Sequence, residues 1–492
     1  MQNRKIRSKS VGNQRRKFMS ISKTTTKKKT VVPREQRSYN DIVAYLDQHW
    51  TTGDQQSTLT RMAQLDQALG HIAKKTPAIL IAGSNGKSLT AHFTTKLLQE
   101  EGLTVGACLS PHILTYNERI ALNQQAVSNK DFTDLANQVI AAAEELTIQV
   151  NSAEVLTMMS LLYFKKKEVD VALLEVHEGG ALHPANICDA KVATVTRVTS
   201  LQAQENEDEL LASLREMMGI VKKETHFVSG DQSKAHLQLM QDITKEHAGV
   251  WIMPIRKLAP LAYPFEQLHG RCAALAERLA AVFVNNFAAK NALVLEDSLL
   301  VKQKGQRGRP TLEAKRQAEL HPKKTVEQFW KETTSSLPNR FHILDKEKPT
   351  ILLDTADNID AFSNLLLGIR LLHYQRPLKG LTIIVAASDK TLHCEEFLKL
   401  VRYFFKKTSG QLFVCPIKHA LPGNHEENSW DAETVTNDFK AMKVKAQAFS
   451  SFQAAFKKAK DSVDERDGLI VVTGSQSIVS EYWKNKGIKK LG

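Results

Sequence analysis

The chain has 492 residues, of which 42% are hydrophobic and 24% charged, and its formal net charge is +14. This length is too great for one compact core, so two or three domains are expected. The composition excludes a wholly disordered chain, and no apolar run approaches the roughly 18 residues that a membrane span needs. Five widely spaced cysteines without a CxxC pair exclude a disulfide framework and predict a cytoplasmic protein.

The positive charge lies in two segments. Residues 1–37 hold 13 Lys and Arg against one acid, a net charge of +12, and residues 302–324 add another +6, which leaves the rest of the chain at −4. Both segments lack the apolar periodicity that would bury one face, so a solvated tail and a solvated internal segment are expected. For the tail, nonspecific nucleic-acid binding and an organelle transit peptide remain open alternatives.

Apolar runs alternate with helical patterns from Ser38, the expected cap of the first helix, to residue 300. Strands are expected at 78–82, 104–108, 170–176, 192–196 and 225–229, and helices at 39–50, 59–72, 87–101, 130–148, 152–166, 206–222 and 270–295. The alternation predicts an α/β domain with a parallel, doubly wound sheet that helices cover on both faces.

A second αβ series begins near residue 350, after a basic linker or insertion at 301–336 in which 313–334 is a candidate helix. Its strands are expected at 350–354, 381–386, 411–415 and 468–472, and its helices at 358–372, 392–406, 432–443, 451–461 and 476–486. This series predicts a smaller Rossmann-like domain at 337–492, which has no GxGxxG motif.

A glycine-rich loop follows the strand at 78–82 and precedes a helix. Its residues are Gly83, Ser84, Asn85, Gly86, Lys87 and Ser88. Such a turn directs backbone N–H groups at an anion, and a lysine neutralises phosphate charge. The first glycine lies only three positions before Gly86, so the generic phosphate-loop pattern is not met and an ordinary glycine turn stays open.

Further motifs follow in a consistent order. They are SPH at 110–112, NERI at 117–120, VDVALLEV at 169–176, EGG at 178–180, LPNRF at 337–341, LLDTADN at 352–358 and VTGS at 472–475. Together with the GSNGKS loop, they resemble the folylpolyglutamate synthase and dihydrofolate synthase family of the Mur ligase superfamily. The resemblance spans residues 40–485, and several ordered motifs are more specific than the loop alone.

The resemblance implies a monomeric ATP-dependent amide ligase. Such an enzyme transfers the γ-phosphoryl group of ATP to a folate or dihydropteroate carboxylate, and the amine of glutamate then attacks the acyl phosphate. A Mur-type ATP-binding domain at 38–300 would carry Lys87 and Glu175 as catalytic residues. The resemblance also assigns the triphosphate to Gly83, Ser84, Asn85, Gly86, Lys87 and Ser88, Mg²⁺ to Ser110 and Glu175, and nucleotide contacts to Arg340 and Asp354.

Several of these residues have a simpler interpretation. Ser110 is also a plausible turn residue before Pro111, and Asp354 is also a candidate N-cap for the helix at 358. Glu175 ends an apolar strand, where ligand crevices of such sheets open, which favours a functional role. His112 is expected to be structural.

The chain also departs from the family pattern. Gln202 lies in the segment where the family has a metal-site histidine, and Met217 stands where it has a carbamylated lysine, so weaker metal binding is expected. On the folate side, Ala181 and His183 replace an arginine and an aspartate, and Asp357 replaces a histidine. Three interpretations follow: an active divergent folate ligase, a noncatalytic or repurposed nucleotide-binding relative, or a Mur-type ligase with another acceptor.

Overall fold

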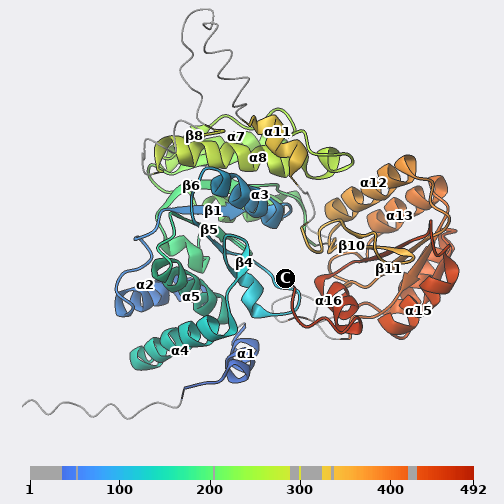
Figure 1. Cartoon of the computed structure of the whole chain (residues 1–492), viewed down its shortest axis with the longest axis horizontal. Coiled ribbons are helices and arrows are strands. Elements are labelled where there is room, and N and C mark those ends of the chain that lie inside the picture. Colours follow the sequence, from blue (N-terminus) through green and yellow to red (C-terminus); the bar gives the residue numbers. More distant parts are fainter. Residues whose placement is uncertain are drawn as a thin grey trace, which may run out of the picture. The chain divides into compact units, whose positions relative to one another are not determined.

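The computed structural model describes residues 36–50, 54–202, 206–288, 298–300, 324–333, 337–418, 421 and 429–491. Residues Arg37–Gly492 form one unit by their internal contacts. Within it, two sheets define what we call the N-terminal lobe (described residues of 37–333) and the C-terminal lobe (337–491) (Figure 1). Most of the two predicted basic segments lies outside the described residues.

The N-terminal lobe has an eight-stranded sheet in the order β4-β3-β2-β5-β1-β6-β7-β8. Its strands are β1 (Ala78–Ala82), β2 (Val105–Cys108), β3 (Ile120–Leu122), β4 (Gln125–Ala126), β5 (Val171–Glu175), β6 (Ala190–Val195), β7 (His226–Ser229) and β8 (Val250–Ile252). All neighbours pair in parallel except β2 with β3 and β3 with β4. The central strands β1 and β5 are buried along their whole length, as a sheet covered on both faces requires.

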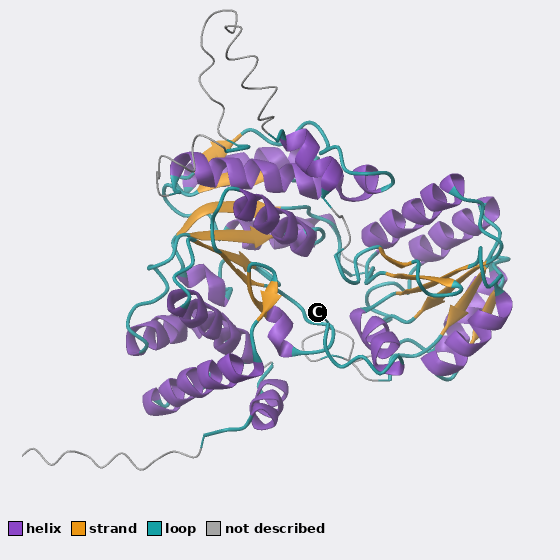
Figure 2. Ribbon diagram, viewed as in Figure 1, coloured by secondary structure: helices purple, strands orange, loops and turns teal. Residues whose placement is uncertain are grey.

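Helices cover both faces of this sheet (Figure 2). Ile79 and Ile81 of β1 pack with the helices on one face, whereas Leu80 and Ala82 pack with those on the other. The helices are α1 (Tyr39–Gln48), α2 (Thr58–Ala68), α3 (Lys87–Glu100), α4 (Asn129–Leu146), α5 (Ser152–Lys166), α6 (Glu207–Met218), α7 (Lys234–Glu246), α8 (Phe265–Asn286) and α11 (Val326–Glu332), with short 3₁₀ turns at Gln55–Ser57, Tyr116–Arg119 and Pro184–Ile187. Among the described residues, no helix combines the length and apolarity that crossing a membrane needs.

The C-terminal lobe has a six-stranded sheet in the order β13-β12-β11-β14-β10-β9, in which only β9 runs antiparallel to its neighbour. Its strands are β9 (His342–Leu344), β10 (Thr350–Leu353), β11 (Leu381–Val385), β12 (Gln411–Val414), β13 (Ala446–Ala448) and β14 (Leu469–Thr473). Its helices are α12 (Ile359–Gln375), α13 (Glu395–Lys407), α14 (Ala432–Ala441), α15 (Phe452–Ser462) and α16 (Gln476–Asn485). The lobe has the predicted Rossmann-like alternation.

Most predicted elements are confirmed to within a few residues, because each is a long apolar run or a capped amphipathic helix. Ser38 caps α1 in a capping box with Asp41. The sheet is not wholly parallel, and the sequence interpretation missed the short strands β3, β4, β8, β9 and β13 and the helix α7. The helix expected at 270–295 begins five residues earlier, at Phe265. The domain boundaries at 300 and 337 remain a prediction.

Candidate active site

The glycine-rich loop leaves the carboxyl end of β1 in a conformation that needs its glycines. Gly83 has φ +130° and Gly86 has φ +86°, both in the region that L side chains rarely adopt. A Cβ on Gly83 would lie 2.2 Å from Thr196 Oγ1. The loop therefore requires glycine at both positions, and α3 begins directly after it at Lys87.

The segment that follows β6 holds this loop in place. The Ser84 N–H donates to the Arg197 carbonyl (2.7 Å), and Ser84 Oγ donates to the Thr199 carbonyl (2.8 Å). Thr196 Oγ1 donates to the Asn85 carbonyl (2.7 Å). The backbone of the loop is thus fixed by three contacts with residues 196–199, which preorganises it for an anionic ligand.

Lys87, Glu175 and Ser110 lie together at this edge of the sheet, as predicted. Glu175 is 4% exposed, and it accepts hydrogen bonds from Ser88 Oγ (3.1 Å) and from the Ser110 N–H (3.3 Å). Lys87 Nζ donates to the Gly83 carbonyl (2.6 Å). Burial raises the pKa of Glu175 and lowers that of Lys87, and the attraction between the two groups opposes both shifts. Glu175 is buried and Lys87 is partly exposed, and each lies close enough to the other to stabilise its charge.

Arg119 is a functional candidate that the sequence interpretation missed. It is 5% exposed, donates to His112 Nδ1 (2.9 Å) and Ser110 Oγ (3.1 Å), and stacks on the rings of Trp50 and Tyr116. Its buried Nη2 has no hydrogen-bond partner among the described residues. Burial lowers the pKa of the guanidinium to about 10. The only sequence signal was its place in the NERI motif, and the structural role expected of His112 stays a prediction.

The C-terminal lobe contributes a second group of charged residues from the ends of β9 and β10. Arg340 Nη1 donates to Thr355 Oγ1, and the Phe341 N–H donates to Asp354 Oδ2 (2.7 Å). Burial raises the pKa of Asp354 to about 6, although Arg340 lowers it. Burial also raises the pKa of Asp357, and the positive charges of Arg340 and Lys87 oppose this rise. The alternative that Asp354 caps the following helix is wrong, because the cap is Asn358.

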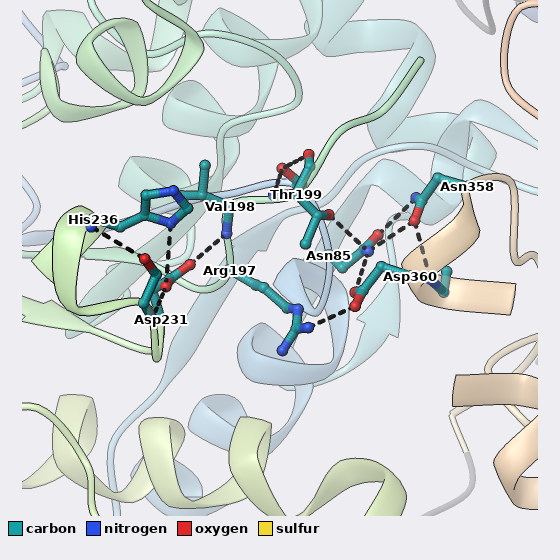
Figure 3. A network of polar contacts seen from close by, with 11 residues as sticks. Asn85, Arg197, Val198, Thr199, Asp231, His236, Asn358 and Asp360 are labelled. Carbon is teal, nitrogen blue, oxygen red and sulfur yellow. Dashed lines mark hydrogen bonds and ion pairs between the residues drawn. The ribbon is translucent and has the colours of Figure 1, made fainter. Parts of the chain in front are cut away.

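Polar contacts join the segment that follows β10, which carries Asn358 and Asp360, to the glycine-rich loop (Figure 3). Asn85 Nδ2 donates to Asn358 Oδ1 (3.0 Å) and Asp360 Oδ2 (2.9 Å), and Asn358 Nδ2 donates back to Asn85 Oδ1 (2.9 Å). Arg197 Nη2 lies 2.6 Å from Asp360 Oδ1. These contacts bring the segment that follows β10 next to the glycine-rich loop.

Four positions that depart from the family pattern have neutral side chains, whereas Asp357 is a carboxylate. Met217 is 6% exposed and belongs to the apolar core, and Gln202 is exposed. His183 caps the turn at Pro184–Ile187 by accepting from the Ala185 N–H (3.1 Å), and burial lowers its pKa to about 4. Charged groups remain nearby, since Glu216 Oε1 accepts from the Leu182 N–H (3.2 Å) and Lys87 and Glu178 act on the pKa of His183.

A divalent cation fits this site through few protein ligands. No group of three or more His, Cys, Asp and Glu side chains in the described part of the chain has the geometry of a metal site. Glu175 is nonetheless a buried carboxylate that accepts from the Ser88 hydroxyl and the Ser110 N–H, and hard cations prefer carboxylate and hydroxyl oxygen donors. Phosphate oxygens and water would have to complete the coordination.

Comparisons with known proteins relate the chain to one group of enzymes. No protein-family model matches it. It is 32% identical over 221 residues to the dihydrofolate synthase/folylpolyglutamate synthase of Bacillus subtilis, covering 44% of this chain and 48% of that protein. It is 30% identical over 202 residues to the folylpolyglutamate synthase of Lacticaseibacillus casei, covering 39% and 46%. The chain thus spans about half the length of the curated relatives it matches.

Solved structures match over nearly the whole chain. The folylpolyglutamate synthase of Mycobacterium tuberculosis complexed with ADP has a TM-score of 0.70 and 19% identity, covering 91% of this chain and 98% of that one. The bifunctional synthase of Yersinia pestis complexed with AMPPNP and Mn has a TM-score of 0.67 and 21% identity, covering 93% and 100%. At these identities the likeness establishes the fold alone, which is the fold of these synthase structures. In sequence, the chain is similar over less than half of its length to curated dihydrofolate and folylpolyglutamate synthases.

Proposed function

We propose that this protein is an ATP-dependent amide ligase that adds glutamate to a folate or dihydropteroate carboxylate through an acyl phosphate. One observation carries the proposal. The glycine-rich loop, Lys87, Glu175 and Ser110 lie together at the carboxyl edge of the sheet, and charged residues of the C-terminal lobe face them. Negative charge spreads over the phosphoryl group during its transfer, and charged side chains from both lobes can stabilise it.

Each residue has a role that follows from its surroundings. The backbone N–H groups from Gly83 to Ser88 would bind the triphosphate, and Lys87 would neutralise the β and γ phosphates. Arg340 and Asp354 would contact the nucleotide from the C-terminal lobe. Lys87 is partly exposed, with Glu175 and Asp357 nearby, and phosphate binding would bring further negative charge to its ammonium group.

Glu175 and Ser110 would hold Mg²⁺ together with phosphate oxygens. The ion supplies positive charge that stabilises the transferred phosphoryl group. The chain's own part is to keep Glu175 ionised and correctly oriented, which the bonds from Ser88 Oγ and the Ser110 N–H support. We further propose that the protein acts as a monomer with a division into domains near residues 300 and 337.

ADP release tests the proposal. Purified protein is given ATP, Mg²⁺, glutamate and either dihydropteroate or tetrahydrofolate, and wild type is compared with Lys87→Ala and with Lys245→Ala, an exposed lysine on α7. We expect release that depends on the folate substrate in wild type and Lys245→Ala, and a loss of at least about 10³-fold in Lys87→Ala. No substrate-dependent release from folded wild type would refute the ligase assignment.

A further inference from the structure

The glycine-rich loop contacts the C-terminal lobe through one of its own side chains. Asn85 lies between the two glycines of the loop, and both its amide nitrogen and its amide oxygen bond to Asn358 (Figure 3). The same nitrogen donates to Asp360 Oδ2 at 2.9 Å and lies 3.3 Å from Thr199 Oγ1. A reciprocal amide pair has a narrow range of geometries, so a displacement of the loop must also break the contact with α12.

Arg197 makes a second connection of the same kind. Its carbonyl accepts from the Ser84 N–H, so its backbone holds the loop, while its guanidinium pairs with Asp360 at 2.6 Å. The two side chains are 41% and 28% exposed, so water screens the pair only in part. One residue thus connects the loop and the C-terminal lobe through its backbone and its side chain.

The partners on α12 are already oriented by that helix. Asn358 is its N-cap and accepts from the Ala361 N–H (3.0 Å), and Asp360 lies in its first turn, where a negative charge is favourable. The lobes also meet through an apolar contact, in which Leu268 and Phe265 of α8 pack near Phe341. That contact involves no residue of the glycine-rich loop.

We propose that Asn85, Arg197, Asn358 and Asp360 form an interlobe polar cluster that couples the conformation of the glycine-rich loop to the position of the C-terminal lobe. Arg197 and Asp360 act in it as positioning residues, because they hold the segment that carries Asp357 towards Lys87. This proposal rests on the proposed function only in one respect, which is that it names a nucleotide as the ligand whose binding depends on the coupling. The coupling itself is measurable without a ligand.

Hydrogen–deuterium exchange of the full-length protein measures the coupling. The variants are Arg197→Gln, Asp360→Asn and the double variant, and the control is Asp345→Asn, which removes an ion pair with Arg376 that lies wholly inside the C-terminal lobe. We expect each single variant to speed exchange about three- to tenfold in peptides covering residues 83–90 and 357–364, and the double variant to be no faster than either. The control should match wild type.

Isothermal titration with MgADP measures the consequence for the ligand. We expect Asp360→Asn to weaken binding about three- to tenfold while the control binds like wild type. Unchanged exchange at 83–90 in both single variants, or additive effects in the double variant, would overturn the cluster. Faster exchange with unchanged MgADP affinity would overturn the coupling to nucleotide. If wild type binds no nucleotide, the proposed function fails, whereas the exchange data still decide the cluster.

Discussion

Two parts of the N-terminal lobe differ in how far they keep the residue types of the family pattern. Around the glycine-rich loop, Arg119 and Glu175 are buried and Lys87 is partly buried, and burial shifts the pKa of each towards its neutral form. Around Met217 and His183, the chain has an apolar side chain and a neutral imidazole. The first part keeps the residue types that phosphoryl transfer needs, whereas the second has lost the charges that the family resemblance implies.

The difference shows which part of the site is maintained at a cost to stability. Buried charges without full compensation destabilise a fold, so their retention indicates a ligand that compensates them. Replacement of charged side chains by well-packed neutral ones removes this cost to stability. It also removes ligands that could hold a second cation. The following four predictions test this contrast, from the largest expected effect to the smallest.

Glu175→Gln should cause the largest loss, because it removes the carboxylate that bonds both Ser88 and Ser110 while keeping the side-chain volume. We expect substrate-dependent ADP release to fall about 10²- to 10³-fold with the fold intact by circular dichroism. Glu347→Gln, which removes a surface pair with Lys486, is the matched control. An active Glu175→Gln variant would show that the charged part is not the catalytic centre.

Met217→Lys should destabilise the protein by about 2–4 kcal/mol, because it would place an ammonium group in the apolar core that Met217 occupies. Met217→Leu conserves the volume and should cost less than about 1.5 kcal/mol. Urea unfolding of both variants measures the difference. Equal stability of Met217→Lys and wild type would mean that this region still accommodates charge, and the contrast between the two parts would be wrong.

Arg119→Met should lower ADP release about 10- to 100-fold, because it removes a buried cation with a free donor beside Ser110 and Glu175. The methionine retains part of the packing on Trp50 and Tyr116, so the variant should stay folded. Arg119→Lys keeps the charge and should recover part of the activity. If both variants retain full activity, the guanidinium has only a structural role.

His183→Asn should change the pH dependence of stability, and we expect this effect to be the smallest of the four. The folded pKa of His183 is about 4 against an ordinary value near 6.5, so the unfolded chain binds the proton first as the pH falls. Stability is therefore unaffected above about pH 6.5 and is lost between 6.5 and 4. The variant keeps a capping acceptor and should lose about 2 kcal/mol less than wild type between pH 7 and 5.

Urea midpoints of both proteins at the two pH values measure this difference. Asp354, whose pKa is raised to about 6, contributes stability of the opposite sign in the same window, but it is common to both proteins and cancels in the comparison. Parallel loss of stability in wild type and His183→Asn would show that His183 is not buried in its neutral form.

Much of the fold was predictable because its signals are local. Buried strands such as β1 and β14 are uninterrupted apolar runs, and helix starts carry capping residues such as Ser38 and Asn151. The short edge strands β3, β4 and β8 were missed because two or three residues are too few to show a period. Their pairing depends on neighbours rather than on their own composition.

The sequence by itself determined the glycine-rich loop, the carboxylate at the end of β5 and the order of the motifs, because each is a property of a short segment. Only the tertiary structure decided what these groups face. Arg119 became a candidate through its burial and its unpartnered nitrogen, and Asn85 through contacts with residues 273 and 275 positions away. Such contacts depend on how sheets and helices pack, and no local pattern encodes a partner at that separation.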